Sequence, residues 1–236
     1  MNSGLVSVIL PTYNEKDNII DLIQAVHREL KDQSYEIIVV DDQSPDGTYQ
    51  TVCELQDEKV KTVLRTADPG LAESIRCGLE QAQGDIILVM DSDFDHDPQY
   101  IPFMLKALEH YDFVCASRFL YGGKMNGWLH SLGSRAFNIF IQCLTQSRLT
   151  DHLYGYFMIK REVLEQCPYD KIFYGYGDYY IRLLYYLEKC KVSIRQFPVV
   201  NGARVRQKET SFLEIFVQYF MAVIRLPEVL HEESHV

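Results

Sequence analysis

The chain has 236 residues, of which 47% are hydrophobic and 24% charged, and this composition fits one large globular domain or two small ones. Its formal net charge of −10 argues against a general nucleic-acid binder, because such proteins need excess basic residues to neutralise phosphates. No apolar stretch reaches spanning length, and no secretory signal precedes the first apolar run. The six cysteines include no C-x-x-C pair, which indicates reduced thiols, a cytoplasmic protein and no zinc site.

The first ninety residues alternate between short apolar runs and segments with helical spacing. The predicted strands are 5–10, 36–40, 60–64 and 86–90, and the predicted helices are 18–30, 48–55 and 70–83. Asp17 stands where the N-cap of the first helix is expected. This order predicts a parallel sheet with helices on both faces and right-handed crossovers.

The second half of the chain is less regular. The predicted strands are 113–116, 156–159 and 192–200, and the predicted helices are 128–144, 161–166, 177–189 and 212–226. Two of these helices, 129–144 and 212–226, carry strongly apolar stripes. Such stripes are typical of a membrane interface, of core packing or of a homodimer contact.

Three carboxylates, those of Asp91, Asp93 and Asp95, stand at alternate positions directly after the predicted strand 86–90. If the extended geometry continues, they project from one side and repel one another unless a cation lies among them. Oxygen ligands of this kind suit Mg²⁺ or Mn²⁺, and Mg²⁺ is commonly bound together with substrate phosphates. The alternative is a polar loop whose carboxylates point into water.

Polar segments follow three predicted strands: Thr12 to Glu15, Asp41 with Asp42, and Asp91 to Asp93. The carboxyl ends of parallel strands meet at one edge of an open α/β sheet, and such sheets bind ligands at that edge. Each segment alone is explained as a loop. The three together predict a shared nucleotide site.

On these residues the chain resembles family 2 glycosyltransferases of the GT-A fold, and among them the dolichyl-phosphate and polyprenyl-phosphate mannosyltransferases. The resemblance extends to about Ser211 and is strongest in 8–15, 39–48 and 90–93, with His96 and Pro98. It implies an α/β, Rossmann-like fold of three layers around a mostly parallel sheet. Residues 1–211 would form this domain, with a nucleotide-binding half of about 1–117 and an acceptor half of about 118–211. Residues 212–236 would form a C-terminal amphipathic helix and tail.

The resemblance also implies roles for single residues in binding a sugar nucleotide. The base and ribose would be held by Pro11, Tyr13, Glu15, Val40 and Asp42. Asp91, Ser92 and Asp93 would meet the metal–diphosphate unit, with Asp91, Asp93 and Asp95 as metal ligands. At the position of Asp95 the family often has an uncharged residue.

Basic residues are implied for the phosphates of both substrates. The segment Ala116 to Phe119 is similar to the family's Gly-Ser-Arg-Tyr, so Arg118 would contact the acceptor phosphate, with a surface salt bridge as the alternative. Arg204 corresponds to a basic loop that covers the diphosphate in relatives, and Arg206 and Lys208 are alternatives for the same role.

The acceptor side departs further from the family pattern. The paired arginines that many relatives carry just after the tryptophan are absent after Trp128, and Arg135 has a different spacing. Asp151 would be structural or would line the sugar pocket. Asp178, at the start of a predicted helix, matches half of an acidic pair whose Asp is the general base in sugar-to-sugar transferases. The alternative is that Asp178 only favours the positive helix terminus.

These features predict an inverting, metal-assisted transfer of a mannose-type or glucose-type sugar from a GDP- or UDP-sugar to a polyprenyl or dolichyl phosphate, with GDP-mannose preferred by resemblance. A lipid phosphate needs no general base, whereas a saccharide hydroxyl would need Asp178. Transfer to a saccharide and an inactive sugar-nucleotide-binding protein are the alternatives. The apolar helices predict peripheral contact with the cytoplasmic membrane face or a homodimer.

Overall fold

The computed structural model describes residues 4–67, 69–124, 128–200 and 212–227. In this part of the chain seven strands form one sheet, in the order β3-β2-β1-β4-β6-β5-β7. Their bounds are β1 Val6–Thr12, β2 Tyr35–Asp41, β3 Val60–Leu64, β4 Ile86–Val89, β5 Phe113–Ser117, β6 Phe157–Lys160 and β7 Ile194–Pro198. The sheet is parallel except for β6, which pairs antiparallel with both β4 and β5.

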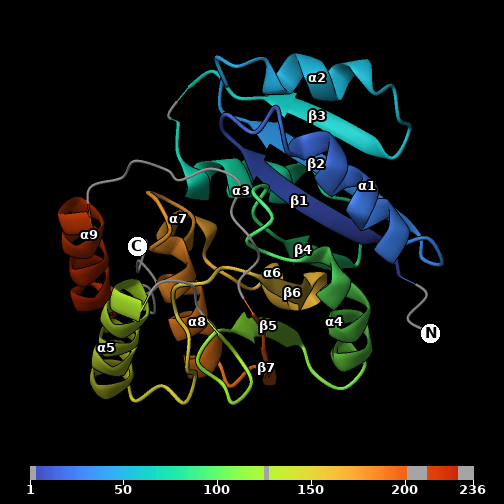
Figure 1. The fold of residues 1–236 in the computed structure, drawn as a ribbon. Helices are drawn as coiled ribbons and strands as arrows, with labels where there is room; N and C mark the ends of the chain where they lie inside the picture. Colours follow the sequence, from blue (N-terminus) through green and yellow to red (C-terminus); the bar gives the residue numbers. More distant parts are fainter. Residues whose placement is uncertain (1–3, 68, 125–127, 201–211, 228–236) are drawn as a thin grey trace, which may run out of the picture.

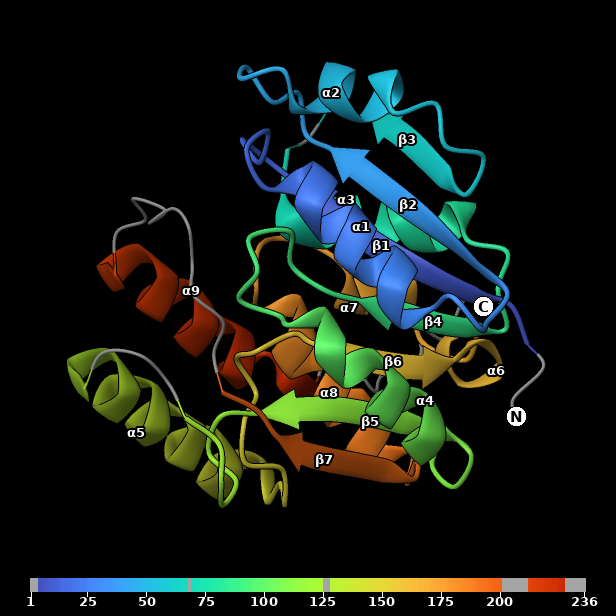
Figure 2. The ribbon, with the colours of Figure 1, turned by 45° about the vertical axis from the view of Figure 1, so that its right-hand side comes forward.

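Helices cover both faces of this sheet, which confirms the predicted three-layer α/β arrangement (Figures 1 and 2). One face carries α1 (Ile19–Glu29), α2 (Thr48–Glu54), η1 (Pro98–Tyr100) and α4 (Ile101–Leu108). The other face carries α3 (Leu71–Gln81), α6 (Arg161–Leu164), α7 (Tyr169–Ile172) and α8 (Tyr179–Lys189). The helices α5 (Trp128–Thr145) and α9 (Phe212–Ile224) lie side by side, on the side toward which the arrowheads of β2 and β5 point in Figure 2.

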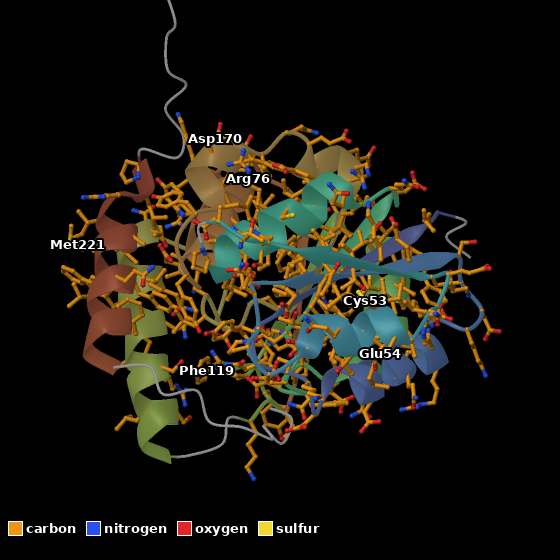
Figure 3. All side chains as sticks on the ribbon, turned by 90° about the horizontal axis from the view of Figure 1, so that it is seen from above. Cys53, Glu54, Arg76, Phe119, Asp170 and Met221 are labelled. Atoms are coloured by element: carbon orange, nitrogen blue, oxygen red, sulfur yellow. The ribbon has the colours of Figure 1, made fainter. Side chains whose placement is uncertain are left out.

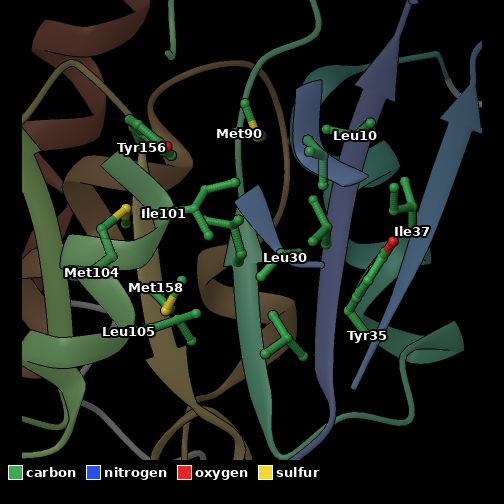
Figure 4. Close-up of a cluster of buried hydrophobic side chains, with 14 of the residues drawn as sticks. Leu10, Leu30, Tyr35, Ile37, Met90, Ile101, Met104, Leu105, Tyr156 and Met158 are labelled. Carbon is green, nitrogen blue, oxygen red and sulfur yellow. The ribbon is translucent and has the colours of Figure 1, made fainter. Parts of the chain in front are cut away.

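The sheet separates two hydrophobic cores, because successive side chains of a strand point to opposite faces. Leu10 of β1 belongs to the core under α1 and α4, whereas its neighbour Ile9 belongs to the core under α3 and α8. Figure 4 shows part of the first core, to which Met104 of α4 and Met158 of β6 both belong. Gly78 brings α3 close to β1, since a Cβ at this position would lie 2.5 Å from Ile9 Cγ2.

The strand β1 continues through Pro11 to Thr12, beyond the predicted end at Leu10. Proline lacks an N–H and is normally excluded from the middle of a sheet. Here it is tolerated because the pairing of β4 with β1 ends at Ile9, so no ladder bond is lost at Pro11.

Other predictions were wrong in ways that have local causes. The extended run through the acidic triplet ends early, because Phe94 adopts a left-handed φ of 62° and the Asp95 N–H donates to Asp93 Oδ1 at 3.1 Å. Asn18, rather than Asp17, occupies the N-cap position of α1, and its side-chain amide donates to Glu15 Oε2 at 3.0 Å. The helices α4 and α7 were not predicted at all.

Candidate functional site

The loops that follow β1, β2 and β4 meet at the carboxyl edge of the sheet. Ser92 Oγ donates to the Pro11 carbonyl at 2.8 Å, which joins the third loop to the end of β1, just before the first loop. The Asn14 N–H donates to Ser44 Oγ at 2.9 Å, which joins the first loop to the second. The structure therefore brings together the three polar segments that the sequence singled out.

Each of these loops contains a non-glycine residue in the left-handed region of backbone space. The φ values are 61° at Asn14, 52° at Gln43 and 62° at Phe94. This conformation costs an L residue on the order of 1 kcal/mol, so the surrounding contacts must hold it in place. Such residues concentrate at binding and catalytic sites, and their recurrence in three adjacent loops supports a functional edge.

In the acidic loop, residues 91–97, the triplet Asp91, Asp93 and Asp95 has one accessible carboxylate and two buried ones, and Asp97 is half-buried. The Asp91 side chain is 33% exposed, whereas Asp93 and Asp95 are 2% and 6% exposed. His96 lies beneath the loop, where its Nδ1 accepts the Asp91 N–H at 2.8 Å and its Nε2 lies 2.7 Å from the Tyr154 carbonyl. These two partners place the ring proton on Nε2, because Nδ1 acts as an acceptor.

No three His, Cys, Asp or Glu side chains gather as a metal site anywhere in the part of the chain that the structure describes. Mg²⁺ in proteins is usually held by one or two carboxylates, with substrate phosphates and waters completing its octahedron. Asp91 and Asp93 supply two carboxylates of the appropriate type, and that of Asp91 is open to solvent. The residues present therefore fit a metal shared with a bound diphosphate better than a metal held by protein alone.

The residues predicted to hold the base and ribose differ in exposure. Tyr13 is 51% exposed, while Pro11 and Glu15 are buried. Val40 is fully buried, its side chain lies close to Gly78 of α3 and its carbonyl accepts from Thr12 Oγ1 at 3.3 Å, so the structure does not expose it to a ligand at this edge.

Asp42 is held by groups that the sequence interpretation missed. Its Oδ1 pairs with the Arg65 guanidinium, and its Oδ2 accepts the Gly70 N–H at 2.9 Å. Arg65 follows β3 directly and lies next to Asp42 because Leu64 pairs with Asp41 in the sheet register. A carboxylate has about four acceptor positions, so Asp42 retains capacity for a ribose hydroxyl.

Arg118 forms a buried ion pair rather than the surface salt bridge considered from the sequence. Its Nε and Nη2 donate to the Asp151 carboxylate at 2.8 and 2.9 Å, and its guanidinium lies 4.7 Å from the centre of the Tyr154 ring. Burial opposes the charge, but Asp151, with smaller contributions from Tyr154 and Asp95, raises the pKa of Arg118 above its ordinary value. Asp151 is fully buried, which supports its structural alternative over a place in a sugar pocket.

Asp178 is also committed to an arginine. Its Oδ2 pairs with Arg182, and its Oδ1 accepts the Tyr176 N–H at 2.9 Å and the Gln218 side-chain amide at 3.0 Å. Asp178 stands at the N-cap position of α8, yet its side chain makes no capping hydrogen bond to the helix. The carboxylate therefore ties α8 to α9, and proton transfer to it would have to compete with these partners. The basic residues Arg204, Arg206 and Lys208 lie outside the described residues.

The helices α5 and α9 share a small core with α8. Phe137, Ile141, Ile181 and Val223 are buried there, so core packing is confirmed for one face of each helix. The two helices also expose seven apolar side chains, at Leu132, Ile139, Leu144, Val217, Phe220, Met221 and Ile224, of which Phe220 stacks on Phe140. Among the described residues, none of the helices combines the length and apolarity needed to cross a bilayer.

Comparison with solved structures identifies the fold. Glucosyl-3-phosphoglycerate synthase from Mycobacterium tuberculosis, crystallised with Mn²⁺, UDP and phosphoglyceric acid, superposes with a TM-score of 0.72 at 22% identity, covering 98% of this chain and 80% of that one. A structure of the same enzyme with Mg²⁺ and UDP gives a TM-score of 0.70, also at 22% identity, over 98% of this chain and 81% of that one. These likenesses confirm the predicted α/β fold of the GT-A type.

Sequence comparison identifies the family. Dolichol-phosphate mannosyltransferase of Pyrococcus furiosus is 32% identical over 228 residues, which cover 94% of this chain but only 63% of that protein. Undecaprenyl-phosphate mannosyltransferase of Micrococcus luteus is 34% identical over 181 residues, which cover 73% of each. The family model described as glycosyl transferase family 2 matches residues 7–167, a range that contains all three polar loops. The chain belongs to glycosyl transferase family 2.

Proposed function

We propose that this chain transfers a sugar from a nucleoside-diphosphate sugar to a polyprenyl or dolichyl phosphate, with inversion at the sugar carbon and with a divalent metal. GDP-mannose is the preferred donor, in line with the two mannosyltransferases that the chain resembles. The observation that carries the proposal is the acidic loop, whose accessible Asp91 carboxylate lies at the sheet edge beside the loops after β1 and β2.

The donor would lie along this edge of the sheet. Tyr13 and Asp42, with Pro11 and Glu15, would bind the nucleoside, and Ser92 would stand near the diphosphate. Asp91 and Asp93 would hold Mg²⁺ or Mn²⁺, and the diphosphate and water, rather than Asp95 as predicted from the sequence, would complete the ligand set. When bound, such an ion stabilises negative charge on a departing diphosphate. Arg204, with Arg206 or Lys208, would add positive charge over the same group.

The reaction would need no proton transfer if the acceptor is a phosphate. An oxygen of the acceptor phosphate forms a bond to the anomeric carbon, while the bond from that carbon to the diphosphate breaks and its electron pair leaves with the diphosphate. Arg118 would contribute positive charge near the acceptor phosphate, and Asp151 would keep its guanidinium in place.

The environment of Asp178 supports a phosphate acceptor over a saccharide hydroxyl. A hydroxyl acceptor requires a general base, which typically contributes 10²–10⁴-fold to the rate. The carboxylate of Asp178, the candidate base, is occupied by Arg182 and Gln218. We therefore expect Asp178→Asn to lower kcat by less than about tenfold.

The test is release of nucleoside diphosphate from GDP- and UDP-sugars with Mn²⁺, with and without polyprenyl phosphate. We expect release that depends on the lipid phosphate and that survives in Asp178→Asn. Asp170→Asn, which removes the carboxylate of a surface pair with Arg76 (Figure 3), is the control for charge loss, and Tm shows whether Asp178→Asn, which breaks a buried pair, stays folded. Release that needs a saccharide and falls at least a hundredfold in Asp178→Asn would replace the proposal by its saccharide alternative. No release under any condition would favour an inactive binding protein.

The exposed apolar faces of α5 and α9 support a peripheral position on a membrane. Val217, Phe220, Met221 and Ile224 form an i, i+3, i+4, i+7 stripe along α9, and Figure 3 shows Met221 pointing away from the molecule. A lipid surface would cover such a stripe and bring the chain to a polyprenyl acceptor. Flotation with liposomes tests this, and a concentration-dependent dimer in light scattering without flotation would assign the stripe to a homodimer.

A further inference from the structure

Tyr154 lies between the acidic loop and Arg118 and contacts both. Its hydroxyl donates to the Asp95 carbonyl at 2.6 Å, and its own carbonyl accepts from His96 Nε2 at 2.7 Å. Its ring lies 4.7 Å from the Arg118 guanidinium and 4.5 Å, edge-on, from the His96 ring. The side chain is 5% exposed, and burial raises the pKa of Tyr154 well above its ordinary value, so the hydroxyl stays a donor.

Two chains of hydrogen bonds lead from Tyr154 to the two ends of the acidic triplet. The first runs from the Tyr154 carbonyl through the imidazole of His96 to the Asp91 N–H. The second runs from the Tyr154 hydroxyl to the Asp95 carbonyl, and the Asp95 N–H in turn donates to Asp93 Oδ1. Both ends of the triplet are therefore positioned from one residue, 59 positions away from Asp95 in the sequence.

We propose that Tyr154 is a positioning residue, acting with His96, that fixes the carboxylates of the acidic loop relative to Arg118. Resting on the proposed function, this inference makes Tyr154 the link between the metal–diphosphate side and the acceptor-phosphate side of the site. A shared support of this kind matters because an error of about 1 Å between reacting groups can cost about a hundredfold in rate.

The test compares Tyr154→Phe with Tyr156→Phe in the full chain. Both substitutions remove one buried hydroxyl that donates to a backbone carbonyl, but the Tyr156 hydroxyl bonds to Asp97, outside the triplet, at 2.9 Å. Calorimetry measures GDP and UDP binding as a function of Mn²⁺ concentration, and thermal unfolding gives Tm. His96→Gln, which alters the other arm, provides a second variant if Tyr154→Phe does not fold.

We expect Tyr154→Phe to raise the Mn²⁺ concentration for half-maximal nucleotide binding by about tenfold, because loss of an outer-shell partner of metal ligands typically costs about 10–100-fold in metal affinity. His96→Gln should shift it in the same direction. Tyr156→Phe should change it by less than about twofold, although both tyrosine variants should lower Tm by similar amounts.

An unchanged Mn²⁺ dependence in Tyr154→Phe, or an equal shift in Tyr156→Phe, would overturn the inference and leave the proposed function standing. If the wild-type chain binds neither GDP nor UDP with Mn²⁺, the proposed function fails and the inference fails with it.

Discussion

Asp91 of the first half of the molecule differs from Asp151 and Asp178 of the second half in exposure and in what its carboxylate contacts. In the first half Asp91 is 33% exposed at the sheet edge, whereas in the second half Asp151 and Asp178 are 0% and 4% exposed and each is paired with an arginine. The same residue type thus serves opposite purposes. For these three residues, exposure and counter-charge distinguish the carboxylate that is open to a ligand from the two that hold parts of the fold together.

The strongest test of this comparison is Asp93→Asn in the acidic loop. The amide removes the charge but keeps an oxygen that can accept the Asp95 N–H, so the loop should retain its turn. We expect turnover to fall by about a thousandfold, because a catalytic metal supplies several kcal/mol of transition-state stabilisation. Nucleoside-diphosphate release measures the effect, and Tm reports whether the fold is intact.

Asp97→Asn is the matched control for this variant. Asp97 belongs to the same loop, lies outside the triplet, and its side chain accepts the Gln99 N–H at the start of η1. The Asp97→Asn variant should keep most of the nucleoside-diphosphate release of the wild type. Wild-type turnover in Asp93→Asn would remove the metal from the proposed mechanism.

The second test addresses the buried pair of the other half. Asp151→Asn leaves the Arg118 charge without its partner inside the protein, and breaking such a pair costs about 3–5 kcal/mol of unfolding free energy. The double variant Arg118→Gln, Asp151→Asn should recover part of this loss, because no unpaired charge remains. Urea denaturation measures both. If Asp151→Asn lowers the free energy of unfolding by less than about 1 kcal/mol, the effect is that of a solvent-exposed ion pair. Such a result would contradict the buried position of the Arg118–Asp151 pair.

The difference between the two halves also explains which parts of the fold and of the site could be predicted from the sequence. In the first half, strands and helices follow from local periodicity, and β3 was predicted with its observed bounds, Val60–Leu64. The carboxyl-edge segments were found because each follows directly after an apolar run. The helix α4 was missed, although Asp97 followed by Pro98 is a helix-start signal that was available just before it.

The hydrogen bonds that hold the site in place could not be predicted from local periodicity, because they join residues that are distant in the sequence. Tyr154 reaches Asp95 across 59 residues, and Arg118 reaches Asp151 across 33. A single sequence carries no local pattern for such bonds. The ion pair between Asp178 and Arg182 could have been predicted from the sequence, since an i, i+4 spacing in a helix places the two side chains together.

The third test uses the pH dependence of stability in the second half. His152 is buried against Asn138, and burial lowers its pKa to about 4 from an ordinary value of 6.5. Because the unfolded chain binds the proton more tightly, the stability contributed by neutral His152 is complete above about pH 6.5 and is lost as the pH falls towards 4.

Between pH 7 and pH 4 we expect the wild type to lose about 3 kcal/mol more unfolding free energy than His152→Asn, which has no titrating group at this position. Denaturant titrations of both proteins at several pH values measure the difference, in which the other titrating groups largely cancel. Parallel pH curves would show that protonation of His152 is not disfavoured by the fold.

The smallest expected effect concerns the exposed stripe of α9. A substitution there should change liposome binding but not the stability of the fold. Ile224 is 51% exposed, so Ile224→Ser removes little buried area and should shift Tm by less than about 2 °C. If the stripe enters a lipid surface, the same change forfeits roughly 1 kcal/mol of burial and weakens liposome binding by about fivefold. Leu64→Ser is the control, because Leu64 is 42% exposed at the end of β3, on the opposite edge of the sheet. Equal flotation of the two variants would mean that the loss of an apolar side chain, wherever it lies, has the same effect, and the stripe would then have no special role at the membrane.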